Sequence, residues 1–403
     1  MNKPVAVGLL GIGGYGHQHL SALRTLQSAG ICRLMAVADP FAFHRAGDVA
    51  ALRSEGVGVY ESTEELCAHE DMEAVFIATP IPLHVSQTVL ALHSGKHVYL
   101  EKPPCATLGE LAQLENAQNA SGKTCTVGFQ LQTAPAIQFV KRQICDGAIG
   151  RLQTVHASIR WRRDDAYYAR ALWAGQWCLQ SDSGKQQPVF DGPATNALAH
   201  VAHAALFLAG ARESDWAGVL RVRGSLKKAR EIESYDSSFL EVETASGVLV
   251  RLAFTHASGA QDAVVLNCAG EIGSFSVDWS GDVTHSSREQ SATKYSFPCD
   301  PHYAALLHFF QSLNDSQTRP ATTLADTRPY LQAVNGALQS SEGAPMFAPE
   351  IIQSIGEGSE RYFTVAGLDE EMVDFSHNAG STPSLLVPGA WIEAENIASD
   401  LVV

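Results

Sequence analysis

Short apolar runs alternate with segments of helical periodicity over the first ~125 residues. Short strands separated by helices are typical of a parallel sheet with helices on both faces. We therefore expect an α/β, doubly wound Rossmann domain over residues 1–127. The pattern predicts strands at 5–10, 34–38, 74–78 and 97–100, and helices at 16–29 and 84–94.

The periodicity changes to strict alternation after residue 126. Val155 and Ala157 lie on one face of a predicted strand at 152–162, and His156 and Ser158 lie on the other. Successive alternating strands indicate an open, mostly antiparallel sheet with one exposed face, which is a natural oligomer surface. We expect an α+β substrate and oligomerisation domain over 128–342. Its further strands are predicted near 219–223, 239–243, 248–254 and 264–268, and its later helices at 303–313 and 328–340.

Charge separates the last sixth of the chain from the rest. The 403 residues contain 28 Lys+Arg and 43 Asp+Glu, so the formal charge is 28 − 43 = −15. Residues 342–403 hold eleven acids and one base, Arg361. We treat 343–403 as an acidic C-terminal extension. The negative balance argues against a nucleic-acid partner, and no apolar run approaches the length of a membrane span.

The eight cysteines show no C-x-x-C spacing, so neither a zinc site nor a redox motif is supported. Scattered free cysteines fit a reducing compartment, and a cytoplasmic location is expected.

A glycine-rich motif follows the first strand and opens the first helix. It consists of Gly11, Ile12, Gly13, Gly14, Tyr15 and Gly16, which is G-x-G-x-x-G. The glycines permit a tight turn, close approach of backbone to a pyrophosphate, and close packing of helix on strand. Asp39 ends the second strand, where a carboxylate binds a ribose 2′-hydroxyl. The motif predicts a dinucleotide site for NAD, with NADP as the alternative because Arg45 is near.

Lys102 follows the strand at 97–100, in the run Glu101-Lys102-Pro103-Pro104. Active sites of open α/β sheets lie at the carboxyl ends of the strands. Lys102 is therefore a candidate catalytic residue.

The segment from Pro193 to Leu208 is predicted as one buried helix, because it contains no Asp, Glu, Lys or Arg. Asn196, His200 and His203 form a polar stripe at helical spacing on it. Buried polar groups need partners, so the stripe indicates a site. Two histidines at i, i+3 without a carboxylate do not complete a metal-ligand set, and no metal is expected.

Aromatic and arginine side chains gather between Arg160 and Trp177. Aromatic rings stack on sugar faces, and arginines bind carboxylates or phosphates. This predicts a pyranose or glycoside substrate with an acidic group. The candidate substrate-binding residues there are Arg162, Tyr168, Arg170 and Trp173.

Together these features resemble the glucose–fructose oxidoreductase / inositol 2-dehydrogenase (Gfo/Idh/MocA) family. The resemblance spans roughly residues 5–341. The matching stretches are Gly11–Gly16, Ala36–Pro40, Ala78–Pro80 with His84, Gly95–Pro103, Gly147–Gly150, Asn196 with His200, and the helices at 303–313 and 328–341.

The resemblance implies a nicotinamide between the two domains, Lys102 in contact with the nicotinamide ribose and the substrate hydroxyl, and His200 as acid/base. It also implies a homodimer or homotetramer formed through the second sheet. The sequence departs from the family where Asn196 replaces an Asp and His203 another Asp. Expected cofactor contacts are the six motif residues, Asp39, Thr79, Pro80, His84, Glu101, Lys102 and Gln130; Asn196 and His203 are expected to bind substrate.

We therefore expect an NAD-dependent oxidoreductase acting on a secondary hydroxyl of a sugar, glycoside or polyol. Two alternatives stay open. An enzyme of the same fold can use NAD transiently to cleave or epimerise a glycoside without net redox. The second alternative is a non-catalytic dinucleotide sensor, which the Asn at 196 and the acidic extension would also fit.

Overall fold

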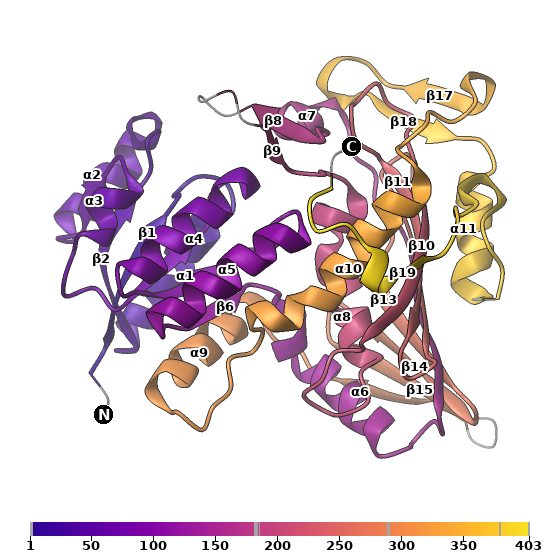
Figure 1. Cartoon of the computed structure of the whole chain (residues 1–403), viewed down its shortest axis with the longest axis horizontal. Helices are drawn as coiled ribbons and strands as arrows, with labels where there is room; N and C mark the ends of the chain where they lie inside the picture. The colour runs from indigo at the N-terminus through magenta and orange to yellow at the C-terminus, as the bar shows by residue number, and fades with distance from the viewer. Residues whose placement is uncertain (1–2, 181–183, 185, 288–290, 379, 402–403) are drawn as a thin grey trace. The chain divides into compact units, whose positions relative to one another are not determined.

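A computed structural model describes residues 3–401 except 181–183, 185, 288–290 and 379. The chain divides into two compact units (Figure 1). The N-terminal unit comprises Met1–Cys105, Gly109–Thr133 and Asp300–Thr327; the C-terminal unit comprises Ala106–Leu108, Ala134–Cys299 and Arg328–Val403. These limits differ from the expected boundaries at 127 and 342. Residues 300–327 belong with the first unit, and the acidic extension belongs with the second.

The N-terminal unit is built on a six-stranded sheet in the order β3-β2-β1-β4-β5-β6. All its strand pairs are parallel, which confirms the doubly wound α/β class. The strands are β1 (Val5–Leu10), β2 (Cys32–Ala38), β3 (Gly58–Tyr60), β4 (Ala74–Ile77), β5 (His97–Leu100) and β6 (Cys125–Val127). The helices are α1 (Gly16–Ser28), α2 (Ala46–Ser54), α3 (Thr63–Cys67), α4 (His84–His93), α5 (Leu108–Ser121) and α9 (Pro301–Asn314), with short 3₁₀ turns at Ala42–Arg45, Ile81–Leu83 and Gln130–Thr133.

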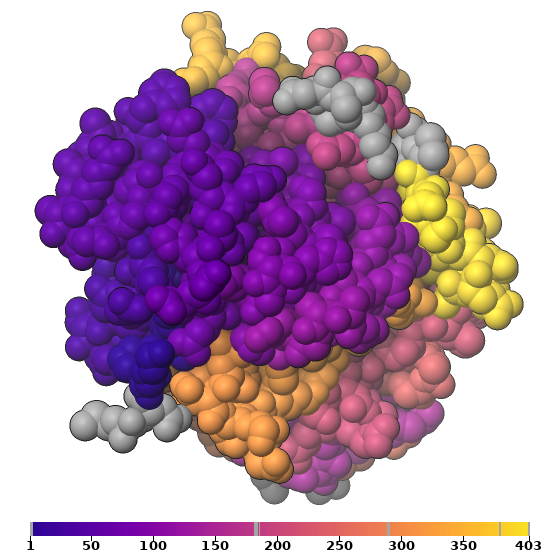
Figure 2. Space-filling model, turned by 60° about the vertical axis from the view of Figure 1, so that its left-hand side comes forward, coloured from indigo at the N-terminus to yellow at the C-terminus, as the bar shows by residue number. Residues whose placement is uncertain are grey.

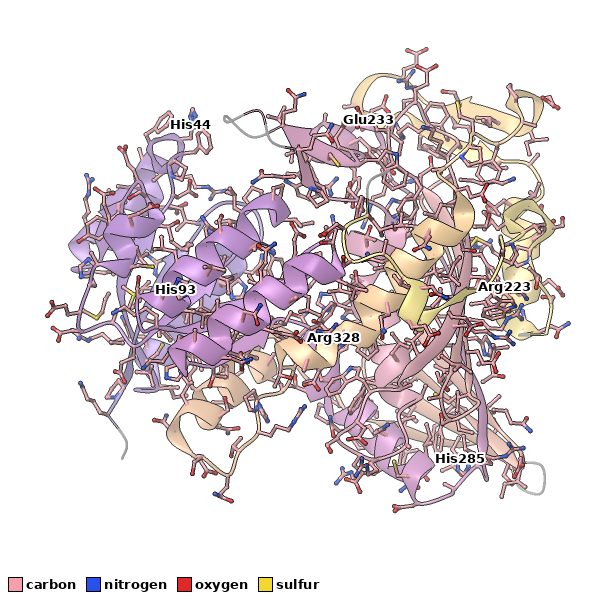
Figure 3. The ribbon with its side chains drawn as sticks, in the orientation of Figure 1. His44, His93, Arg223, Glu233, His285 and Arg328 are labelled. Carbon is pink, nitrogen blue, oxygen red and sulfur yellow. The ribbon has the colours of Figure 1, made fainter. Side chains whose placement is uncertain are left out.

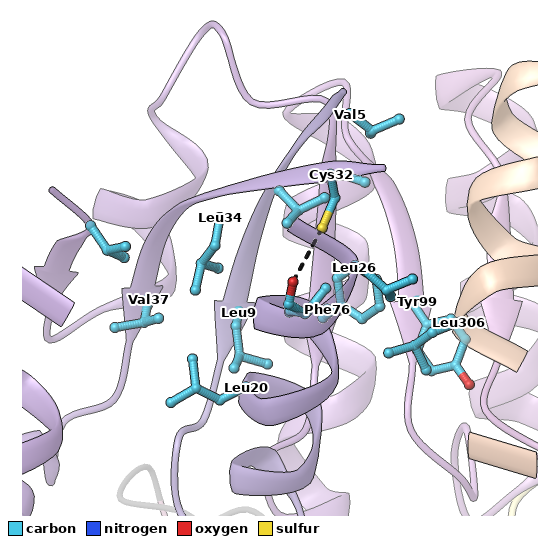
Figure 4. Close-up of a cluster of buried hydrophobic side chains, with 14 of the residues drawn as sticks. Val5, Leu9, Leu20, Leu26, Cys32, Leu34, Val37, Phe76, Tyr99 and Leu306 are labelled. Atoms are coloured by element: carbon cyan, nitrogen blue, oxygen red, sulfur yellow. Dashed lines mark hydrogen bonds between the residues drawn. The ribbon is translucent and has the colours of Figure 1, made fainter. Parts of the chain in front are cut away.

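The core of this unit includes side chains from a distant stretch of the sequence. Leu9, Phe76 and Tyr99 on the sheet belong to one buried cluster with Leu306 and Phe309 of α9. Figure 4 shows Leu306 beside Tyr99. The rings of Phe76 and Phe309 meet edge to face, with centroids 5.4 Å apart. In the space-filling view the orange surface of α9 lies directly beside the indigo and purple surface of the N-terminal residues (Figure 2). The apolar stripe of α9 therefore completes the core of the first unit.

The C-terminal unit is built on a nine-stranded sheet in the order β16-β15-β14-β13-β7-β12-β11-β10-β19. Among the described strand pairs of this sheet only β7–β12 is parallel, so the mostly antiparallel sheet is confirmed. The strands are β7 (Leu152–Arg160), β10 (Val219–Lys227), β11 (Ser237–Thr244), β12 (Leu249–Thr255), β13 (Val265–Gly270), β14 (Gly273–Asp278), β15 (Asp282–Ser287), β16 (Thr293–Ser296) and β19 (Ile392–Glu393).

Two small hairpins and several helices complete this unit. The hairpins are β8 (Cys178–Gln180) with β9 (Gln186–Pro188), and β17 (Ile352–Ile355) with β18 (Tyr362–Val365). The helices are α6 (Pro135–Cys145), α7 (Asp165–Ala169), α8 (Ala199–Leu208), α10 (Leu324–Ser341) and α11 (Leu368–His377), with a π-helical turn at Pro193–Ala197 and 3₁₀ turns at Pro349–Ile351, Gly358–Glu360, Ser384–Leu386 and Ala394–Asn396. Within the described parts of the chain, no helix combines the length and the apolar character that a membrane crossing requires.

Helices cover both faces of the nine-stranded sheet. Val155 and Ala157 of β7 are buried on the face that α8 covers, as the alternation predicts. On the other face Ser158 Oγ donates to the Met372 carbonyl of α11 (2.7 Å), and a ring nitrogen of His156 lies 3.3 Å from the Ser376 carbonyl. The yellow helix α11 lies on this side of the sheet in Figure 1. The prediction that this face is exposed is therefore wrong at β7, because the extension covers it.

The extension also closes one edge of the sheet. Strand β19 pairs with β10, and the guanidinium carbon of Arg223 lies 4.7 Å from the centroid of the Trp391 ring beside β19. Figure 3 labels Arg223. Arg251 of β12 is 4% exposed at its side chain; it donates to Glu241 and to the Ser381 carbonyl. A charged pair this deep is stable only when both partners are hydrogen-bonded, and the extension supplies part of that bonding.

The apolar contacts of α11 should make it a large contributor to stability. Phe375 is fully buried among Phe239, Leu368 and Met372. Phe375→Ala should lower the free energy of unfolding by about 3–5 kcal/mol, because it removes a buried ring and leaves a cavity.

Urea unfolding followed by circular dichroism measures this change. Val373→Ala on the exposed side of the same helix is the matched control, and it should change the free energy by less than about 0.5 kcal/mol. Equal effects of the two variants would contradict the burial of α11.

Candidate functional site

The glycine-rich turn joins β1 to α1 and has the geometry that a bound pyrophosphate needs. Gly11 adopts φ +83°, in the left-handed region, and a Cβ there would lie 2.6 Å from the Ala78 carbonyl. A Cβ on Gly13 would meet only the Arg45 side chain, at 3.7 Å. A Cβ on Gly14 would meet nothing within 4 Å, so the turn is open at Gly14 and is bordered by Arg45 at Gly13. The amino end of α1 begins at Gly16, and its backbone N–H groups and positive dipole end suit an anion.

Asp39 follows β2 and is held beside this turn. Its Oδ2 accepts from the Ile12 N–H at 3.0 Å, and its Oδ1 accepts from the Phe41 N–H at 2.8 Å. These bonds fix the carboxylate next to the glycine turn, where it can accept a ribose hydroxyl through its remaining lone pairs. The loop after Asp39 carries the exposed Phe43 ring, which is tilted by 40° against the ring of His44, labelled in Figure 3.

Lys102 follows β5 at the carboxyl edge of the sheet, and a buried carboxylate fixes its backbone. Glu101 Oε2 accepts from the Lys102 N–H at 3.1 Å, and Glu101 Oε1 lies 2.8 Å from His19 Nε2 of α1. His302 of α9 continues this line, with its Nε2 3.3 Å from His19 Nδ1. Three elements, β5, α1 and α9, thus contribute to the position of the Lys102 backbone. The peptide bond between Lys102 and Pro103 is cis.

His84 holds the other side of the same turn. Its ring nitrogens lie 2.8 Å from the Pro103 carbonyl and 2.9 Å from the Thr79 carbonyl, and its side chain is buried. Burial lowers the pKa of His84, so the neutral ring donates to one carbonyl at a time. His84 was expected to contact the cofactor; here both ring nitrogens face backbone, so it links the Thr79-Pro80 loop to the Lys102 turn.

The remaining cofactor candidates of this unit meet at the same edge. Tyr15 Oη donates to Gln130 Oε1 at 3.1 Å, which joins the glycine turn to the segment after β6. Thr79 Oγ1 donates to Gln87 of α4, and Pro80 precedes the 3₁₀ turn at Ile81–Leu83. The N-terminal unit therefore brings together all of its predicted cofactor residues along the carboxyl ends of β1, β2, β4, β5 and β6.

The predicted helix over 193–208 is interrupted. Residues Pro193–Ala197 form a π-helical turn in which the Leu198 N–H donates to the Pro193 carbonyl, and α8 starts only at Ala199. The Tyr330 hydroxyl, from α10, donates to the carbonyls of Thr195 (3.1 Å) and Ala194 (3.3 Å). Asn196 therefore lies in the π-helical turn and His200 in α8, so the prediction of one regular helix over 193–208 is wrong.

Asn196 is paired with a carboxylate that the sequence did not single out as functional. Its Nδ2 donates to Asp191 Oδ1 at 2.8 Å, and Asp191 Oδ2 accepts from the Gly175 N–H at 2.7 Å. A guanidinium nitrogen of Arg170 lies 4.0 Å from the same Asp191 oxygen. Asp191 therefore places a negative charge beside Asn196, at the position where the resembled family has an Asp.

The two histidines of α8 differ in their surroundings. His200, near the start of the helix, is 7% exposed, and its ring meets that of Trp279 edge to face at 5.8 Å. His203 is 1% exposed and packs against the rings of Trp216 (5.3 Å) and Tyr330 (6.4 Å). The aromatic packing gives His203 a place in the core, whereas His200 lies nearer the surface.

The predicted substrate segment forms a cation–aromatic cluster. The Arg170 guanidinium lies 3.5 Å from the centroid of the Tyr167 ring and 4.7 Å from that of Trp173. Tyr168 Oη lies 3.2 Å from His256 Nδ1, and Arg162 points its guanidinium at the Tyr362 ring instead. Tyr168, Arg170 and Trp173 are thus held in one network, and Arg162 belongs to a neighbouring one.

Sequence reasoning missed Asp191, His19, His302, His256 and Tyr330. Asp191 carried a signal, because it is an acid five residues before Asn196 in a segment otherwise free of charge. The partners of the other four lie far away in the sequence, and no local pattern identifies them. Across the described residues, no group of three or more His, Cys, Asp or Glu side chains is arranged to hold a metal ion.

These features make the N-terminal unit a dinucleotide-binding Rossmann domain. Residues 5–129 match the family model described as "Oxidoreductase family, NAD-binding Rossmann fold", which is the Gfo/Idh/MocA model. Over this domain the chain is similar to the Gfo/Idh/MocA oxidoreductases, which agrees with the resemblance found in the sequence.

Relatives with named activities align mainly with the first part of the chain. The scyllo-inositol 2-dehydrogenase (NAD(+)) of Bacillus subtilis is 32% identical over 152 residues, which is 38% of this chain and 43% of that protein. The inositol 2-dehydrogenase of Rubrobacter xylanophilus is 34% identical over 150 residues, which is 37% of this chain and 42% of that protein. The chain thus spans less than half the length of these two curated relatives.

Solved structures share the fold over both units. The WlbA dehydrogenase of Chromobacterium violaceum, in complex with NADH and UDP-GlcNAcA, has a TM-score of 0.71 at 22% identity and covers 85% of this chain and 95% of its own. A levoglucosan dehydrogenase in complex with NADH has a TM-score of 0.70 at 17% identity, and covers 84% and 97% respectively.

The histidine line behind Lys102 should make stability depend on pH. Burial, together with the neighbouring His19, lowers the pKa of His302 from 6.5 to about 4. The unfolded chain therefore binds a proton at pH values where the folded chain does not, and stability should rise as pH increases from about 4 to 6.5.

Urea midpoints measured across that range test the effect. His302→Gln should flatten the slope, and His44→Gln at an exposed histidine should leave it unchanged. An unaltered slope in His302→Gln would show that His302 is not the responsible group.

Proposed function

We propose that this protein is an NAD-dependent oxidoreductase that transfers a hydride between nicotinamide and a secondary hydroxyl of a sugar, glycoside or polyol. The observation that carries the proposal is the arrangement at the carboxyl edge of the Rossmann sheet. There the glycine turn, open at Gly14, occurs together with the oriented Asp39 carboxylate and the Lys102 turn. This combination supplies cofactor binding and a cation for the reacting oxygen.

The candidate site residues of the N-terminal unit have separate roles in the proposed reaction. The glycine turn and the amino end of α1 bind the pyrophosphate, and Asp39 binds the adenosine ribose. Asp39 repels a 2′-phosphate and so favours NAD, whereas the Arg45 side chain beside Gly13 would attract the 2′-phosphate of NADP. NAD, when bound, accepts the hydride. The Lys102 ammonium stabilises the charge that develops on the substrate oxygen.

His200 of the C-terminal unit is the proposed acid/base. Oxidation of a secondary alcohol requires a group that takes the hydroxyl proton, and a neutral imidazole suits this near pH 7. Asn196 binds a substrate hydroxyl, with its amide oriented by Asp191. Asp191 thereby supplies the carboxylate that Asn196 itself lacks.

The substrate class follows from the aromatic segment and from the named relatives. Tyr168 and Trp173 offer ring faces to a pyranose, and Arg170 offers a cation to an acidic substituent. The relatives are named as inositol dehydrogenases, and structures with this fold hold NADH together with UDP-GlcNAcA or belong to a levoglucosan dehydrogenase. These names support a cyclic compound rich in hydroxyl groups.

Removal of either proposed catalytic group should abolish most of the turnover. NADH formation across a panel of sugars, polyols and glycosides should fall by about 10²–10⁴-fold in Lys102→Ala and in His200→Ala, the range typical of a lost general acid or base. Lys294→Ala on the exposed strand β16 is the control and should keep full activity.

Two results would contradict the proposal, and each would support one of the two alternative functions. Release of an aglycone or an isomerised sugar without NADH indicates transient use of the cofactor. NAD binding measured by calorimetry, without turnover of any panel member, indicates a sensor.

The acidic part of the substrate is tested separately at Arg170. In Arg170→Ala the KM for a uronate should rise about tenfold while the KM for the matching neutral sugar stays within about twofold, because one charge-assisted contact is lost. Arg170→Lys should retain part of the affinity, since it keeps the charge but not the planar geometry. Unchanged KM values for both sugars would remove the acidic group from the proposal.

A further inference from the structure

The acidic extension reaches the proposed substrate segment through the hairpin β17–β18. Asp164 forms an antiparallel bridge with Tyr362, and the Asp165 N–H donates to the Arg361 carbonyl at 2.9 Å. The start of α7 is therefore paired, backbone to backbone, with residues from the last sixth of the chain.

A shared carboxylate reinforces this pairing. Asp165 accepts from Arg361 Nε at 2.7 Å, and its other oxygen accepts from the guanidinium of Arg230. The Asp165 side chain is 24% exposed and that of Arg230 is 8% exposed, so the bridge to Arg230 is shielded from water. The Asp165 carboxylate, at the first position of α7, thus pairs with two guanidinium groups. Of these, Arg361 belongs to the extension.

Arg230 connects the extension to Tyr168. Its guanidinium lies 4.5 Å from the centroid of the Tyr168 ring and 4.7 Å from that of Phe363. Its backbone N–H donates to the buried Asp236 at 3.1 Å, which anchors Arg230 to the sheet. A cation near two aromatic rings is stabilised electrostatically by both. Here one ring belongs to the substrate segment and the other to the extension.

Helix α7 depends on these contacts for its geometry. It contains five residues and none of them is buried, and a single helical turn is not stable by itself in water. Tyr167 and Tyr168 lie on this helix, and Arg170 and Trp173 follow it directly. Displacement of the helix would therefore displace the side chains proposed to bind the carbohydrate.

We propose that the C-terminal extension is part of the substrate site: Arg361 and Phe363 are positioning residues that hold α7, through Asp165 and Arg230, in the geometry that binds the carbohydrate. This inference rests on the proposed function, because it assigns these residues to the same site. It gives the extension a role in substrate affinity that is separate from its burial of the sheet.

The experiment compares Arg361→Ala with Arg361→Lys and with a matched control. Arg361 is about half exposed, so its removal should leave the fold intact. Arg151→Ala removes an exposed arginine that pairs with Glu271, at β7 and β13 of the same unit. In Arg361→Ala the KM for the carbohydrate should rise about fivefold, with kcat and the Kd for NAD within about twofold, since binding geometry and not chemistry is lost.

The conservative variant distinguishes positioning from general stability. Arg361→Lys keeps the charge beside Asp165 and should restore part of the KM change. Arg151→Ala should behave as the wild type. Equal KM values in Arg361→Ala and Arg151→Ala, or a fall in kcat at constant KM, would overturn the inference.

A second readout separates this inference from the proposed function. If the wild type binds NAD but oxidises no carbohydrate, the proposed function fails, and hydrogen–deuterium exchange decides about the extension. The amides of residues 164–170 should then exchange at least about threefold faster in Arg361→Ala than in the wild type and in Arg151→Ala, because the hairpin no longer holds α7. Equal exchange in all three proteins would overturn the positioning role.

Discussion

The hydrogen bonds of the buried Glu101 carboxylate are the interactions that join the elements around Lys102 in the N-terminal unit. The carboxylate accepts from the Lys102 N–H and pairs with His19, and through His19 it is linked to His302 of α9. A Cβ on Gly128 would lie 2.9 Å from its Oε1, so the segment after β6 approaches it closely as well. An uncompensated carboxylate at this depth would be costly. Four elements, α1, β5, β6 and α9, therefore meet at the Glu101 carboxylate. Because this carboxylate accepts a hydrogen bond from the Lys102 N–H, it also fixes the position of Lys102.

Local pattern predicted the elements whose contacts are local. The glycine turn, Asp39 and the Lys102 turn all follow short apolar strands, and parallel topology places the ends of such strands at one edge. Periodicity also predicted a helix at 303–313, which is α9. It could not assign that helix to the first unit, because its apolar stripe carries no information about which core it joins. Proximity of Phe309 to Phe76 is known only from the fold.

The predictions failed where a distant residue alters a local pattern. The segment 193–208 has the composition of one regular helix, but the Tyr330 hydroxyl binds the carbonyls at Ala194 and Thr195, and the turn there is π-helical. The alternation in β7 correctly assigned Val155 and Ala157 to the core. It suggested water as the partner of His156 and Ser158, whereas their partners are carbonyls of α11. Polar residues on a strand face thus indicate that this face forms hydrogen bonds, but they do not show whether the partner is water or another part of the protein.

The place of α9 in the first unit has a consequence for how the protein is made. A ribosome releases the six strands of the Rossmann sheet long before it releases residues 301–314, and the whole of the second unit up to β16 is synthesised in between. During that interval Phe76 and Tyr99 lack the side chains of α9 that bury them. The nascent Rossmann sheet consequently exposes this apolar surface while residues 128–300 are synthesised, and its native core forms only after α9 has been made.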